Sequence, residues 1–103
     1  MSASVLLRFD RSLGVLSAHL ADAHVVRARP SKIDNCLVLE LDASGRVVGV
    51  EILEPTAMPS SAWYEHSDRH QLPATLRAEV DAWLEEMWAH MAARVHEGPT
   101  KGR

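Results

Sequence analysis

The spacing of the apolar residues changes once along this chain, near residue 54, and this change restricts the fold more than any other feature. Before it, apolar residues recur at every second position over short runs, as at Leu37, Leu39 and Leu41. A period of two is typical of strands that bury one face. After it, apolar residues recur every three or four positions, which is typical of an amphipathic helix. We therefore predict an α+β domain in which a sheet precedes a helix.

Short connections decide how the strands of the first half pair. Strand-like runs cover residues 5–10, 16–21, 36–41 and 47–53. Residues 24–29 continue the second run or pair with it, and Pro30 either limits this segment to an edge or ends it. Asp42 to Gly45 is typical of a tight hairpin turn. Parallel neighbours need much longer connections than these. Residues 1–54 are therefore predicted to form an antiparallel β-meander of about four strands.

The second half is predicted to contain a linker and one long C-terminal amphipathic helix. Residues 55–72 include two prolines and are expected to be a linker with at most a short helical turn near Trp63. Pro73 favours a helix start, and Gly98-Pro99 indicates its end, so the helix should span 73–97. Its apolar face consists of Leu76, Val80, Trp83, Leu84, Met87, Met91 and Val95. We expect a single domain over residues 1–98 and a flexible tail over 99–103.

Composition excludes several classes of function. The 103 residues carry 11 basic and 14 acidic side chains, a net charge of -3, and neither half is strongly basic, which makes nucleic-acid binding an unfavoured function. No apolar run approaches the length of a membrane span. Cys36 is the single cysteine and cannot form an internal disulfide, so a cytoplasmic location is expected. We expect this thiol to be buried and unreactive.

Residues 6–54 carry a set of motifs that resembles a family of small bacterial proteins catalogued as a domain of unknown function. The motifs are an aromatic-Asp pair, a Leu-rich second strand and a Gly-x-Glu-Ile-Leu ending, here Phe9, Asp10, Leu16, Leu20, Asp42, Gly45, Gly49, Glu51, Ile52 and Leu53. The resemblance implies a small β-rich fold, assigns no catalytic residues and leaves open a toxin–antitoxin-like pairing with another small protein.

One polar stretch could hold a metal ion. His66, Asp68 and His70 lie on one face if the backbone is extended, and the two histidines align at i and i+4 if it is helical. Two imidazoles and a carboxylate suit zinc or a similar metal. The alternative is a polar connector ahead of the helix, and no more distant pattern supplies a further ligand. We therefore expect no cofactor and keep the metal-dependent enzyme as an alternative function.

Arg27 and Arg29 form a small basic cluster before Pro30. They could contact phosphate, which would fit an antitoxin-like or nucleic-acid-associated partner. Charged residues also protect an exposed sheet edge from pairing with other chains. The second interpretation is favoured.

The strongest functional indication is apolar surface on both sides of the predicted sheet. Trp83, Trp88 and Met91 widen the apolar face of the helix, and Val50 belongs to a strand with apolar residues on both faces. One helix covers one face, and tryptophan is enriched at interfaces. These four residues are therefore predicted to be core or interface, and dimerisation is the simplest way to cover the rest. The favoured function is a non-enzymatic cytosolic protein that self-associates and acts by protein interaction or regulation, with a small protein as a further partner.

Glu51 interrupts an apolar run, and alternation assigns it to the face opposite Val50. Gly49 shares that face and leaves room for a neighbour or a bulge. We expect Glu51 to be a structural residue bonded to an adjacent strand.

Overall fold

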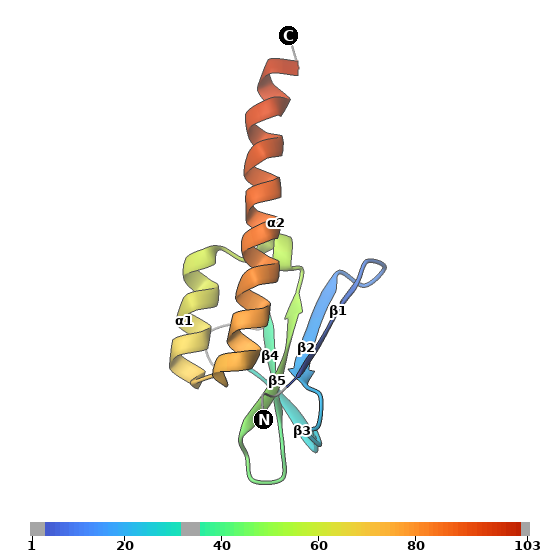
Figure 1. Cartoon of the computed structure of the whole chain (residues 1–103). Coiled ribbons are helices and arrows are strands. Elements are labelled where there is room, and N and C mark those ends of the chain that lie inside the picture. The colour runs from blue at the N-terminus through green and yellow to red at the C-terminus, as the bar shows by residue number, and fades with distance from the viewer. Residues whose placement is uncertain (1–3, 32–35, 102–103) are drawn as a thin grey trace.

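The computed structural model describes residues 4–31 and 36–101, with side chains up to residue 94 in the last helix. Its elements confirm the α+β class with an antiparallel sheet (Figure 1). Five strands form the sheet: β1 Val5–Asp10, β2 Val15–Leu20, β3 Arg27–Pro30, β4 Leu37–Leu41 and β5 Val47–Leu53. A 3-10 turn, η1 Pro55–Ala57, and two helices, α1 Ser60–His70 and α2 Ala74–Lys101, follow.

The strand order corrects the predicted meander. The order across the sheet is β1-β2-β5-β4-β3, so β5 lies between β2 and β4. The strand count is five because residues 27–30 form an edge strand of their own. Strands β3, β4 and β5 follow one another as hairpins, and β2 lies beside β5, which is a Greek-key arrangement. The apolar and longest strand occupies the centre, while the Arg- and Pro-containing strand remains at an edge.

Two turns of the sheet are held by the same hydrogen-bonding pattern, in which an aspartate side chain accepts from a serine two residues later. The Oδ1 atom of Asp10 accepts hydrogen bonds from the backbone N–H and the hydroxyl of Ser12, at 3.0 and 2.7 Å. Asp42 does the same with Ser44, at 2.9 and 2.7 Å. Gly14 and Gly45 close these turns with positive φ angles of 66° and 86°, which favour glycine. The predicted hairpin over 42–45 is thus present, and the hydroxyl hydrogen bonds lower the pKa of both aspartates.

Both helices belong to one hydrophobic core with one face of the sheet. Residues 55–72 were expected to be a linker, but they contain η1 and the eleven-residue helix α1. Trp63 on α1 is completely buried, and its Nε1 donates to Asp81 of α2 at 2.6 Å. The apolar residues of α2 that complete this core are Leu76, Val80 and Leu84. Helix α1 was not predicted because its buried face contains the polar residues His66 and Ser67, which interrupt the apolar pattern of a helix.

Helix α2 is longer than the sheet it covers. Its 28 residues span about 42 Å, against about 23 Å for the seven residues of β5. The C-terminal half of α2 therefore extends beyond the body of the protein (Figure 1). The helix continues through Gly98 and Pro99, where its end was predicted, to Lys101. The last two residues of the predicted tail lie outside the described part. Among the described helices, none is long and apolar enough to cross a membrane.

Candidate functional site

The two edges of the sheet differ in sequence and in exposure. β1 forms one edge and β3 the other. On β1, Val5, Leu7 and Phe9 are half-buried against the core, and Leu6 on the opposite face is 54% exposed. All four residues of β3, by contrast, are exposed.

Arg27 and Arg29 lie on β3 and pair in register with Leu41 and Leu39 of β4. The N–H of Ser31 donates to Leu37 at 2.8 Å, and the alternation of an antiparallel ladder directs the N–H of residues 27 and 29 to β4 as well. Residues 28 and 30 then face outward, so the missing N–H of Pro30 removes a donor from the free edge. This edge has the charged and proline residues that protect sheets from further pairing.

Of the four predicted core or interface residues, Val50 and Trp83 pack within the body of the protein, whereas Trp88 and Met91 lie where α2 leaves it. Val50 is 1% exposed and belongs to the core. Trp83 is half-buried, and its ring lies 5.2 Å from the ring of Phe9 on β1. Trp88 and Met91 are farther along α2, where the helix leaves the sheet, and Met91 is 36% exposed.

Trp88 and Met91 line a shallow hollow where α2 leaves the body. The segment from Thr56 to Ser60 forms the other wall, and the hollow measures about 320 Å³. The indole Nε1 of Trp88 donates to the carbonyl of Met58 at 3.3 Å, and Tyr64 packs edge-on against the same ring at 6.2 Å. The ring is therefore held in one orientation beside the apolar side chain of Met91.

The predicted metal-binding residues do not meet as a group. His66 and His70 lie on one face of α1, as their i, i+4 spacing requires, and their ring nitrogens approach Ser31 Oγ at 2.8 and 2.9 Å. Asp68 lies elsewhere on the helix, where its carboxylate accepts from Arg77 at 2.7 Å. Among the side chains described, those of residues 4–31 and 36–94, no three from His, Cys, Asp or Glu are arranged to hold a metal ion.

The cluster formed by Ser31, His66 and His70 ties α1 to the end of β3. Ser31 and His66 are buried, and a hydroxyl can accept from one imidazole while it donates to the other. Sequence reasoning paired the two histidines but had no signal for Ser31, which lies 35 residues from His66.

Cys36, expected to be buried, is exposed just before β4.

Glu51 lies on the face of the sheet that the two helices leave open. Its register partners are Ser17 on β2 and Val38 on β4, and its carboxyl lies close enough to that of Glu40 to raise the Glu40 pKa. Partial burial raises the pKa of the Glu40 carboxyl, and the neighbouring charge of Glu51 raises it further. The described neighbour of Glu51 on an adjacent strand is therefore Glu40 of β4, a second carboxyl.

Gly49 makes room for the Glu40 side chain. A Cβ atom at position 49 would collide with the Glu40 carboxyl and would lie 2.7 Å from the Cβ of His19. Gly49 is itself buried, and a shift in the register between β4 and β5 occurs next to it. The Gly-x-Glu motif therefore describes the packing of one carboxyl pair on the open face.

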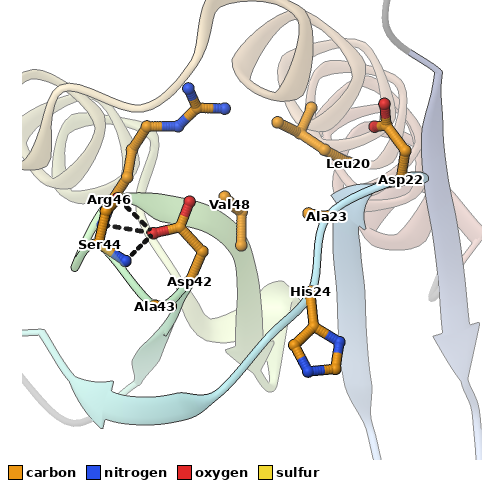
Figure 2. Close-up of a pocket in the computed structure, with 9 residues that line it drawn as sticks. All are labelled: Leu20, Asp22, Ala23, His24, Asp42, Ala43, Ser44, Arg46 and Val48. Carbon is orange, nitrogen blue, oxygen red and sulfur yellow. Dashed lines mark hydrogen bonds between the residues drawn. The ribbon is translucent and has the colours of Figure 1, made fainter.

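A second hollow lies between the β2–β3 connection and the β4–β5 hairpin (Figure 2). It measures about 470 Å³, and Leu20 and Val48 contribute apolar side chains while Asp22, His24 and Arg46 contribute polar ones. Asp42 lines it too, but one of its carboxylate oxygens is occupied by the turn. The hollow is wide open to solvent and its charges are mixed in sign, so it favours no single chemistry.

Comparison of the chain with protein-family models, with curated proteins and with solved structures finds no match. The resemblance of residues 6–54 to the small bacterial family therefore stays a prediction.

Proposed function

We propose that the protein acts by associating with other polypeptide chains, first of all with a second copy of itself, and not by catalysis. The observation that carries the proposal is the β1 edge. It is six residues long, contains no proline and has one charged residue before its end, Arg8. An edge of this kind is a template for an additional strand.

The opposite edge gives the contrast that makes this observation informative. β3 is shorter, exposed and protected by two arginines and a proline. A protein that functions as a monomer benefits from protection at both edges, because either one can recruit other chains. Here one edge is protected and the other is apolar, which favours a role for the second.

Two proline variants test the proposal on the whole chain. Val5→Pro removes an outward N–H from β1 but none of the bonds between β1 and β2. Ala28→Pro is the matched control, because it removes an outward N–H from β3. Circular dichroism first establishes that both variants fold.

Sedimentation equilibrium between roughly 5 and 200 µM, the range in which weak specific dimers form, then measures association. We expect a monomer–dimer equilibrium for the wild type and for Ala28→Pro, and a monomer for Val5→Pro. A wild type that stays at 11.4 kDa throughout the range would contradict self-association. A folded Val5→Pro variant that still forms the dimer would show that β1 is not the edge used.

A further inference from the structure

Three residues of β1 direct backbone groups away from the sheet. The N–H of Ala21 donates to the carbonyl of Ser4 at 2.8 Å, and the register pairs Val5 with Leu20. Because bonded and non-bonded residues alternate along an antiparallel pair, residues 4, 6, 8 and 10 bond to β2. The N–H and C=O groups of Val5, Leu7 and Phe9 therefore point to the free side and can bond to a further strand.

Two requirements restrict how a second β1 can add here. A two-fold axis makes the pairing antiparallel, and a continuous sheet keeps the covered face of both copies on the same side. Residues of the covered face then pair with each other. One residue of β1 therefore lies directly opposite the same residue of the second copy, on either side of the axis, and is called the axial residue here. The axial residue is Leu6, Leu7 or Arg8 if a substantial part of the strand is to be paired.

These three registers differ in charge and in overlap. With Arg8 on the axis, two guanidinium groups lie directly opposite each other, which is unfavourable. With Leu6 on the axis, Arg8, Phe9 and Asp10 have no partner within β1. With Leu7 on the axis, every residue from Val5 to Phe9 is paired, and no like charges are opposed.

The Leu7 register also covers the apolar surface that β1 leaves exposed. On the covered face, Val5 lies beside Phe9 of the second copy, which extends the core where Phe9 already contacts Trp83. On the open face, the exposed Leu6 lies beside Arg8 of the second copy, whose aliphatic stem can cover it.

We infer that β1 pairs with β1 of a second copy with Leu7 opposite Leu7, so that the two sheets join into one. This inference rests on the proposed self-association and adds its interface and register. In this register, residue 6 lies directly opposite Arg8 of the second copy, so a charge placed at position 6 should change the stability of the dimer according to its sign.

Two substitutions at the exposed position 6 test the register. Opposite Arg8, glutamate attracts and lysine repels, and the symmetric dimer contains this pair twice. We expect the Leu6→Glu dimer to be about tenfold tighter than the Leu6→Lys dimer at low salt. The net charge of -3 per chain works in the opposite direction at an unspecific interface, where lysine would be favoured. A glutamate preference therefore identifies the local contact.

Leu13→Glu and Leu13→Lys are the matched controls, because Leu13 is 72% exposed in the turn beyond the paired residues. They should show no glutamate preference. Equal weakening by both Leu6 variants would indicate Leu6 opposite Leu6, and a lysine preference would indicate Asp10 opposite Leu6 or an unspecific effect. Any of these results, or no effect, overturns the register while the association of the wild type still stands. A monomeric wild type overturns the proposed function as well.

Discussion

The two faces of the sheet are built from the same strands but provide opposite environments. On the covered face, the residues of the three inner strands are all apolar and buried: Leu16, Ala18, Leu20, Leu37, Leu39, Leu41, Val48, Val50 and Ile52. On the open face, the same strands present the polar residues Ser17, His19, Glu40 and Glu51 beside Val15, Val38 and Val47, all half-buried. Neighbouring residues of one strand therefore lie in different environments. The face of the sheet on which a residue lies determines whether a polar side chain is tolerated there, more than its position along the chain does.

The contrast between the faces also explains why a charged residue is tolerated within β5. Glu51 follows Val50 directly, but it faces solvent and Glu40, whereas Val50 faces Leu39 and the helices. A carboxylate costs several kcal/mol where no water or partner can reach it. The change in the free energy of unfolding caused by a substitution should therefore depend on the face to which the substituted side chain points.

The largest effect is expected where a charge enters the covered face. Val50→Asp should unfold the protein or destabilise it by at least about 4 kcal/mol, because the carboxylate would be buried without a partner. The reverse exchange next to it, Glu51→Val, should change the free energy of unfolding by less than about 1 kcal/mol. Urea unfolding followed by circular dichroism compares the two. A stable Val50→Asp variant would break the distinction between the faces.

A smaller but clear loss is expected from a methyl group on the open face. Gly49→Ala should destabilise by about 2 kcal/mol, although alanine is the better strand residue, because the new Cβ meets Glu40, His19 and the carbonyl of Ala18. Adding Glu40→Ala should recover part of the loss, since it clears one of the three contacts. If Gly49→Ala proves neutral, the open face is less tightly packed than described.

Ser31→Ala tests how the cover is attached to the sheet. The substitution removes the hydroxyl that contacts both His66 and His70, and it should cost about 1 to 2 kcal/mol in the free energy of unfolding. Ser44→Ala in the exposed turn is a control that removes a solvent-exposed hydroxyl. A loss at Ser31 no larger than that at Ser44 would mean that the buried cluster does not hold α1.

The smallest effect concerns the pH dependence of the open face. The pKa of Glu40 is raised above its ordinary value of 4.5, first by burial and then by Glu51. The folded state therefore binds the proton more tightly than the unfolded state, and this carboxyl destabilises the fold increasingly as the pH rises from 4.5 through the folded pKa. Glu40→Gln should stabilise the protein at pH 7 by about 0.5 kcal/mol, after allowance for solvent screening.

The gain from Glu40→Gln should decline as the pH falls through the folded pKa toward 4.5, and it should vanish below 4.5, where the wild-type carboxyl becomes protonated in both states. Chemical unfolding at a series of pH values measures it. Glu86→Gln on the exposed surface of α2 is a control that removes one negative charge elsewhere. An equal gain from both variants would assign the effect to net charge, not to the carboxyl pair.

Alternation was sufficient to predict four of the five strands and their faces, because the apolar residues of each run are the ones that the fold buries. It placed Glu51 opposite Val50 correctly. It could not predict that β5 lies in the centre, because strand order depends on pairing between residues far apart, such as Ser17 with Glu51. Helix α1 escaped prediction because polar side chains, His66 among them, occupy part of its buried face.

The candidate site was predictable in part for the same reason. Arg27, Arg29 and Pro30 indicate an edge strand by their chemistry alone, and β3 is one. Nothing in the sequence marks β1 as the other edge, because a run such as Val5 to Phe9 would fit an inner strand equally well. The asymmetry between the edges is visible only once the strand order is known.

The central position of β5 has a consequence for the protein while it is being made. Of the described strands, β5 alone joins the β1–β2 hairpin to the β3–β4 hairpin, so the sheet cannot close before residue 53 has been synthesised. The last core residue of the covering helices, Leu84, follows roughly 2 to 6 s later at ordinary rates of translation. A sheet that closed before Leu84 joined the core would leave its apolar face bare, and the chain would then be most exposed to chaperones and to premature contact with its neighbours.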